Sequence, residues 1–147
     1  MTDAIKPANA TPWHFWAVVV LGLLWNGFGV FNFYGSMTMD DAALQAAGMT
    51  AAQIDYFRAM PGWTTVAYAV GTIGALIGTI LLLLRSKWAM HVFALSLAGF
   101  LATRVYMYAL SDGATVMPSF GIDAAILAGC VFFLWYAWSS AKNGLLR

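Results

Sequence analysis

Charged residues are scarce in this chain. Only 9% of its 147 residues are Asp, Glu, Lys or Arg, whereas 62% are hydrophobic. A soluble globular domain carries about 25% charged residues, so this composition excludes an ordinary soluble domain. The formal net charge is only +1, which supplies no long-range attraction for nucleic acid. We therefore expect no nucleic-acid partner.

Cysteine and histidine are also nearly absent. Cys130 is the only cysteine, which excludes a disulfide framework and a Cys-x-x-Cys redox pair. His14 and His91 are the only histidines, and they do not form a His-x-x-x-His metal motif. The sequence contains no Ser/His/Asp grouping and no glycine-rich phosphate loop beside a strand. We therefore expect no catalytic site, no metal and no cofactor, and we predict that the protein is not an enzyme.

What the sequence has instead is long apolar stretches. A helix needs roughly 20 apolar residues to cross the hydrocarbon core of a bilayer, and the lack of water there makes each such span helical. Four stretches reach this length: residues 13–35, 63–84, 88–110 and 119–139. The sequence therefore predicts an all-α membrane protein, an antiparallel bundle of four transmembrane helices that forms one domain over residues 1–147.

The distribution of Lys and Arg predicts the orientation of this bundle. Of the basic residues, Arg58 alone lies in a loop on one side of a four-span topology, and Arg104 lies inside a span. The other five all fall on the opposite side: Lys6, Arg85, Lys87, Lys142 and Arg147. The positive-inside rule then places both termini in the cytoplasm. The first apolar stretch is too long for the core of a signal peptide, so we expect it to remain in the membrane.

The long outer loop, residues 36–62, contains signals for two short helices. Thr38 or Asp40 can cap the first of them. Thr50 and Gln53 fit a capping box, in which each side chain accepts a hydrogen bond from an exposed backbone amide at the start of the second helix. We expect this helical pair to lie against the membrane surface or to cap the bundle.

Arg104 and Asp123 are the charged residues inside the predicted spans. Charged side chains in hydrocarbon are costly unless they are paired. Because a short loop joins their two spans, an ion pair between them is one interpretation. In the other interpretation, Arg104 extends toward the outer surface and Asp123 is stabilised by the N-terminus of its helix.

Several polar and aromatic residues lie near this pair in the outer half of the spans. Asn26 can hydrogen-bond a neighbouring helix, as buried amides commonly do, or it can contact a ligand. Aromatic rings beside Asn, Asp and Arg suit a polyol or a sugar, because rings stack on C–H groups while polar groups bond the hydroxyls. The candidate substrate-binding residues are Trp25, Asn26, Asn32, Tyr68, Arg104, Tyr108 and Asp123.

Methionine and histidine allow a different chemistry. Six of the eight methionines fall on the outer side: Met37, Met39, Met49, Met60, Met107 and Met117. Thioethers bind Cu(I), although methionine also fills irregular apolar gaps. His14 and His91 lie near the inner ends of their spans, where two imidazoles can ligate one haem iron. A haem- or copper-handling membrane protein is therefore one hypothesis.

Small residues recur four positions apart in three of the spans, which indicates close helix contacts. They are Gly71, Gly74, Ala75 and Gly78 in the second span, Ala94, Ala98 and Ala102 in the third, and Gly121, Ala125 and Gly129 in the fourth. We favour packing within the bundle. The other interpretation is an interface in a homo-oligomer or a larger membrane complex.

Four strings carry a resemblance to a known family: LLWNGFGVFNFYGSMTM, YFRAMPGW, GTIGALIGTILLLLRSKWA and RVYMYAL. Together they resemble a family of small four-span bacterial inner-membrane proteins that are catalogued as candidate sugar transporters. The resemblance implies a multi-pass protein of the bacterial inner membrane. Asn32 stands where we expect an acidic residue after the Trp-Asn-Gly stretch, so any ion coupling by that acid is missing here.

Three functions follow as hypotheses. The first is a carrier or facilitator for a small polar solute such as a sugar, and the second is an accessory or assembly subunit of a larger membrane complex. The third is the haem- or copper-handling protein. Transporters commonly place the substrate between repeated halves of the fold. Four spans are few for that arrangement, so a carrier is expected to be an oligomer.

Overall fold

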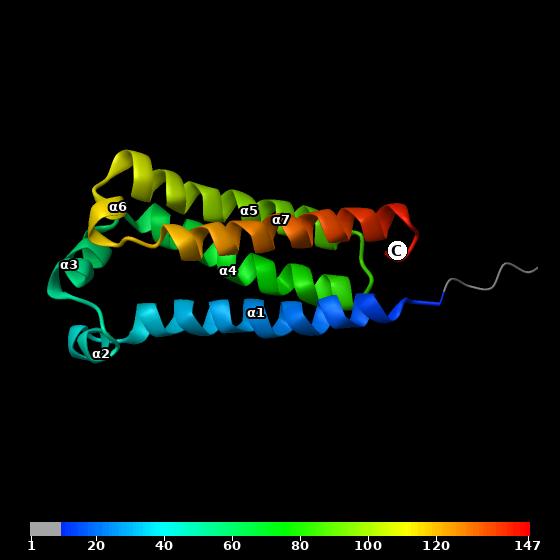
Figure 1. The fold of residues 1–147 in the computed structure, drawn as a ribbon, viewed down its shortest axis with the longest axis horizontal. Helices are drawn as coiled ribbons and strands as arrows, with labels where there is room; N and C mark the ends of the chain where they lie inside the picture. The colour runs from blue at the N-terminus through cyan, green and yellow to red at the C-terminus, as the bar shows by residue number, and fades with distance from the viewer. Residues whose placement is uncertain (1–9) are drawn as a thin grey trace, which may run out of the picture.

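The computed structural model describes residues 10–147, and these residues form helices without any strand. Figure 1 shows four long helices side by side, with successive helices antiparallel. They are α1 (Trp13–Thr38), α4 (Gly62–Leu83), α5 (Trp88–Val105), which continues as the π-helical turn η1 (Tyr106–Leu110), and α7 (Phe120–Lys142). Each is long and apolar enough to cross a membrane. The predicted all-α bundle of four spans is therefore confirmed, while Lys6 lies outside the described residues.

The long helices differ from the predicted spans at their ends. The first helix ends at Thr38 instead of residue 35, and the last ends at Lys142 instead of residue 139. At the end of α1, the hydroxyls of Ser36 and Thr38 donate to helix carbonyls one turn back, at 2.8 Å in both cases. An apolar stretch ends at the first polar residues, whereas the helix continues through them.

Three short helices lie together at one end of the bundle, which we name the cap end (Figure 1). They are α2 (Asp41–Ala46), α3 (Ala51–Ala59) and α6 (Gly113–Val116). The side chain of Asp40 accepts a hydrogen bond from the amide of Ala43 at 2.8 Å, and both bonds of the Thr50–Gln53 capping box are formed. The predicted helical pair is confirmed. Helix α6 was not predicted, because its sequence Gly-Ala-Thr-Val has no helical periodicity over one turn.

The tightest helix contact joins α4 and α5. A Cβ atom on Gly99 would lie 2.7 Å from the carbonyl oxygen of Ala67, and a Cβ on Gly78 would lie 2.9 Å from the Phe93 ring. The hydroxyl of Ser96 donates to the carbonyl of Gly71 across the same contact at 2.6 Å. The small residues of the second span therefore pack inside the bundle, as favoured from the sequence.

The small residues of the other two spans mostly face outward. Ala94 and Ala98 on α5, and Gly121 and Ala125 on α7, are exposed on the surface of the chain. For the third and fourth spans, packing within the bundle is therefore not what the structure shows. The helical period explains the difference, because the inward faces of α5 and α7 carry other residues, among them Phe93 and Phe133.

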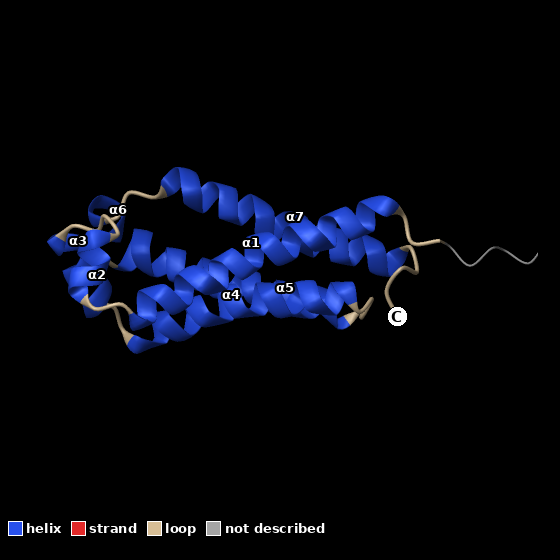
Figure 2. Ribbon diagram, turned by 90° about the horizontal axis from the view of Figure 1, so that it is seen from below, coloured by secondary structure: helices blue, strands red, loops and turns tan. Residues whose placement is uncertain are grey.

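The main apolar core lies at the opposite end, which we name the turn end because the α4–α5 turn, residues 84–87, is there. This turn-end core is built from buried side chains of all four long helices and of the segment after α7: Phe15, Val19, Leu82, Ala89, Phe93, Phe133, Tyr136, Ala137, Leu145 and Leu146. Figure 2 shows the chain after α7 folding back at this end.

Backbone hydrogen bonds fix this returning segment to the α4–α5 turn. The amide of Arg147 donates to the carbonyl of Arg85 at 2.6 Å, and the amide of Lys87 donates to the carbonyl of Arg147 at 3.0 Å. The side chain of Arg85 adds a bond from its Nε to the carbonyl of Leu145 at 2.8 Å. These bonds hold Leu145 and Leu146 in the turn-end core and close that end of the bundle.

Candidate functional site

The two charged residues of the spans meet at the cap end. Nη1 of Arg104, near the end of α5, donates to Oδ1 of Asp123, in the first turn of α7, at 2.6 Å. The side chains are 27% and 10% exposed, respectively. Of the two interpretations of these residues, the structure therefore shows the ion pair. The start of α7 also favours a negative charge at Asp123, because helix N-termini carry partial positive charge.

Two hydroxyls complete the surroundings of this carboxylate. Tyr108 donates to Oδ2 of Asp123 at 2.6 Å, and Ser119 donates to the same oxygen at 2.9 Å. Tyr108 follows Arg104 by one turn and belongs to η1, so both side chains reach α7 from the same side of the helix. Short π-helical turns occur often at functional sites.

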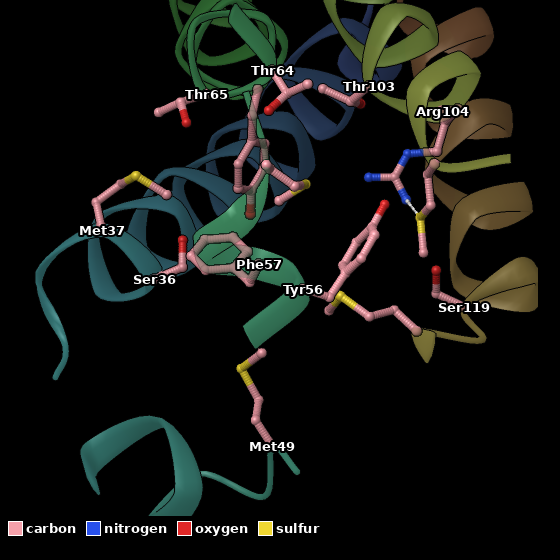
Figure 3. A pocket seen from close by; sticks show the side chains of 14 residues that line it. Ser36, Met37, Met49, Tyr56, Phe57, Thr64, Thr65, Thr103, Arg104 and Ser119 are labelled. Atoms are coloured by element: carbon pink, nitrogen blue, oxygen red, sulfur yellow. Dashed lines mark hydrogen bonds between the residues drawn. The ribbon is translucent and has the colours of Figure 1, made fainter. Parts of the chain in front are cut away.

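A cavity of about 240 Å³ lies beside this ion pair, lined by residues of α1, α3, α4, α5 and η1 and of the segments on either side of α3 and before α7 (Figure 3). Its lining combines aromatic rings, thioethers and hydroxyls with the guanidinium of Arg104, which is the charged group of the lining. The lining residues are Ser36, Met37, Met49, Tyr56, Phe57, Met60, Thr64, Thr65, Tyr68, Thr103, Arg104, Met107, Met117 and Ser119. A cavity with this lining can hold a small solute with both polar and apolar parts.

Helix α3 forms a wall of the cavity through Tyr56 and Phe57 and is fastened to the neighbouring segments by hydrogen bonds. The hydroxyl of Tyr56 lies 2.6 Å from the hydroxyl of Ser111, after η1. Nε2 of Gln53 donates to the carbonyl of Val116 in α6 at 3.2 Å. On its other side, Arg58 forms an exposed ion pair with Asp41 at 3.2 Å. These few polar contacts can break while the turn-end core stays intact.

The guanidinium of Arg104 has donors left over for a ligand. Nη1 is used by Asp123 and by the sulfur of Met107, the latter at 3.4 Å. Nε is buried and has no hydrogen-bond partner among the described residues. A buried donor without a partner costs about 1–3 kcal/mol. Figure 3 shows the other terminal nitrogen, which is not joined to Met107, pointing toward the middle of the cavity.

Besides Ser119, three hydroxyls of the lining have already committed their hydrogen atoms. Ser36 donates to the carbonyl of Phe33 at 2.8 Å. Thr64 donates to the carbonyl of Pro61 at 2.6 Å, and Thr103 donates to the carbonyl of Phe100 at 2.6 Å. A hydroxyl has one hydrogen and two lone pairs. Toward the cavity these three groups therefore act as hydrogen-bond acceptors.

The structure brings together four of the seven candidate substrate-binding residues. Tyr68 and Arg104 line the cavity. Tyr108 and Asp123 do not line it, but they hydrogen-bond to each other, and Asp123 pairs with Arg104. These four come from three different helices, so their meeting depends on how the bundle packs.

The other three candidates lie away from the cavity. Trp25 is 52% exposed, and Asn32 is exposed with its Nδ2 bonded to the carbonyl of Phe28 in its own helix at 2.9 Å. Both share the outward face of α1 with Phe28, because positions three, four and seven apart lie on one side of a helix. Nδ2 of Asn26 donates to Oγ1 of Thr79 on α4 at 2.9 Å. Asn26 therefore makes the contact with a neighbouring helix that was one of its two interpretations.

Sequence reasoning missed the contributions of α3 and of the threonines. Tyr56 and Phe57 lie on a short helix outside the spans, and Thr64 and Thr103 resemble ordinary helix residues in the sequence. The available signal was the apolar face of the predicted second short helix, because such a face has to pack against another part of the protein. That face alone does not reveal a cavity.

The methionines and histidines also have defined places. Five of the six outer methionines line the cavity, and Met39 is the exception. The permanent charge of Arg104 in the same wall opposes a bound cation such as Cu(I). His14 lies 2.8 Å from the hydroxyl of Tyr136, and the ring of His91 packs beside Trp88 with centroids 5.4 Å apart. Residues 10–147 contain no group of three or more His, Cys, Asp or Glu side chains placed to hold a metal.

No family model, curated protein or solved structure matches this chain. The resemblance to the four-span family therefore stays a prediction.

Proposed function

We propose that this protein is a carrier or facilitator for a small polar solute in the bacterial inner membrane. Its four apolar helices support the membrane location, and the distribution of Lys and Arg supports cytoplasmic termini. In that orientation the turn end faces the cytoplasm and the cap end faces outward. The solute then enters from the outer side.

The observation that carries this proposal is the cavity beside Arg104. A cavity of 150 Å³ is large enough for benzene. The volume of about 240 Å³ therefore leaves room for a six-carbon solute with polar substituents. A charged group inside a membrane bundle marks a functional site by default, because its burial is costly.

The arrangement of contacts supports a two-step passage. In the first step α3 moves aside, which requires the Tyr56–Ser111 bond to break. In the second step the turn-end core separates, because its rings and the segment around Leu146 close the route to the cytoplasmic side. Four helices offer little surface for such a rearrangement, so we propose that the carrier works as a homo-oligomer.

Uptake into proteoliposomes tests the proposal directly. Purified protein is reconstituted, and the uptake of labelled hexoses, hexitols and hexonates is compared with that of empty vesicles. We expect saturable uptake of at least one of them and a strong decrease in Arg104→Gln. Lys142→Gln is the control, because it removes a positive charge at the end of α7 that does not line the cavity. Uptake equal to that of empty vesicles for all solutes contradicts a carrier of this class.

An accessory subunit of a larger membrane complex is the second candidate. The exposed small residues favour it, because Ala94 and Ala98 on α5 and Gly121 and Ala125 on α7 offer faces that another helix can approach closely. Native mass spectrometry of the protein extracted from its own membranes separates the two candidates. Stoichiometric association with larger membrane proteins supports the subunit, whereas a homo-oligomer alone supports the carrier.

A further inference from the structure

We infer that the solute of this cavity is a small hydroxy carboxylate, an acid that bears one carboxylate and several hydroxyl groups. This inference rests on the proposed function and narrows its substrate class. It follows from the directions of the hydrogen bonds in the lining, which require an acceptor on one side of the ligand and donors on the other.

Arg104 supplies the side that requires an acceptor. Its Nε lacks a partner, and a terminal nitrogen points into the cavity. Because Asp123 engages only Nη1, Nε and Nη2 remain as the two donors of one edge of the guanidinium. Such an edge matches the two oxygens of a carboxylate. Nη2 faces the cavity, and a small rotation of the guanidinium toward the ligand gives Nε the acceptor that it lacks.

The local charges permit a second carboxylate beside Asp123. Asp123 accepts bonds from Tyr108 and Ser119 in addition to Arg104, and it lies in the first turn of α7. These groups stabilise the negative charge of Asp123 even when Arg104 shares its positive charge with a ligand. Asp123 is also not part of the cavity lining. An anionic ligand therefore meets the guanidinium and not the carboxylate.

Three hydroxyls of the lining require donors on the ligand. Ser36, Thr64 and Thr103 have given their hydrogens to backbone carbonyls, so each can only accept a hydrogen bond from a ligand. Their bonds then have to come from O–H or N–H groups of the solute. An alkyl carboxylate offers no such donors. A neutral polyol offers donors but no charged acceptor for Arg104.

Three open-chain six-carbon compounds separate these requirements. Gluconate has the carboxylate and the hydroxyls, sorbitol has only the hydroxyls, and hexanoate has only the carboxylate. The affinity of each for the full chain in mild detergent is measured by calorimetry, with a titration into empty micelles as the background. We expect gluconate to bind at least about tenfold more tightly than either of the others, which corresponds to about 1.4 kcal/mol.

Two variants test the two sets of ligand contacts, namely the donors of Arg104 and the acceptor hydroxyls. Arg104→Lys keeps the charge but loses the planar pair of donors, so it should remove most of the preference for gluconate over sorbitol. Thr103→Val removes one acceptor and should weaken gluconate while leaving hexanoate unchanged. Lys142→Gln is the control and should change none of the affinities, because Lys142 lies at the end of α7 and does not line the cavity. The melting temperature of each variant shows whether it is folded.

Three other outcomes would each contradict a particular part of this inference. Equal binding of gluconate and sorbitol overturns the carboxylate and leaves a carrier of neutral solutes. Equal binding of gluconate and hexanoate overturns the role of the acceptor hydroxyls. Saturable binding of none of the three, with folded protein, overturns both this inference and the proposed use of the cavity.

Discussion

Nη1 of Arg104 and Oδ1 of Asp123 lie 2.6 Å apart and join α5 to α7 beside the cavity. The pair has two consequences at once. It ties the start of α7 to the end of α5, and it fixes the direction in which the other nitrogens of Arg104 point. Stability and the proposed ligand binding therefore depend on the same contact.

Removing either partner of this pair should destabilise the protein. Breaking a buried ion pair costs about 3–5 kcal/mol, and the partial exposure of Arg104 lowers our expectation to about 2–3 kcal/mol for Arg104→Gln or Asp123→Asn. The free energy of unfolding in detergent measures it. The double variant should lose less than the sum, with a coupling energy of about 1 kcal/mol or more. Additive losses would show that the two groups act independently.

The chain contains its own comparison for this measurement. Arg58 and Asp41 form an ion pair at 3.2 Å whose side chains are 42% and 64% exposed. Exposed pairs contribute about 0–1 kcal/mol. Arg58→Gln should therefore change the free energy of unfolding by less than about 1 kcal/mol in the same assay. A loss as large as that of Arg104→Gln would indicate a general effect of positive charge.

The Asn26–Thr79 bond should matter for folding and not for the solute. Hydrogen bonds between membrane helices average about 0.6 kcal/mol and reach about 1.7 kcal/mol. We expect a coupling energy in this range between Asn26→Ala and Thr79→Val. Solute affinity should stay the same in both variants, because neither residue lines the cavity. A selective loss of affinity in Asn26→Ala would return Asn26 to the binding site.

Glycine substitutions should separate the α4–α5 contact from the open face of α1. In Gly99→Ala the new Cβ lies 2.7 Å from the carbonyl oxygen of Ala67, so we expect a loss of about 1–3 kcal/mol from overpacking. In Gly29→Ala the Cβ meets nothing within 4 Å. There we expect a gain of about 0.5–1 kcal/mol from the helix preference of alanine. Thermal unfolding in the same detergent distinguishes the expected loss of stability from the expected gain.

Helix α3 should open more often when its bond to Ser111 is removed. Tyr56→Phe deletes a contact of 2.6 Å, and one hydrogen bond contributes about 0.5–1.5 kcal/mol. Hydrogen exchange of the amides in α3 should then be about two- to tenfold faster. Asp55→Asn is the control on the same helix, because Asp55 is exposed. Equal exchange in wild type and Tyr56→Phe would show that other contacts hold α3 in place.

The fold could be predicted because the bilayer leaves few choices. Four apolar stretches of sufficient length require four helices, and the short connections between the last three require antiparallel neighbours. The capping signals of Asp40 and of Thr50 with Gln53 are local, and they predicted α2 and α3. Helix α6 has one turn and no local signal of that kind.

The site could be predicted only in part. Arg104 and Asp123 stood out because a charge in hydrocarbon needs a partner, and a short loop limited where the partner could be. Trp25 and Asn32 were assigned to the site from residue type, and the rotation of α1 places them on its outward face. Rotation about a helix axis depends on packing, because an apolar span in lipid is hydrophobic on every side and has no clear inward face.

The closed turn end has a consequence for rates. Phe15, Phe133 and Leu146 pack across this end, so the cavity has no open route through it. In the proposed carrier, a solute in the cavity reaches the cytoplasmic side only after these side chains have moved apart. Collective rearrangements of that size take microseconds to seconds. For the proposed carrier, the transport rate is then limited by how often this rearrangement occurs, and it saturates at high solute concentration.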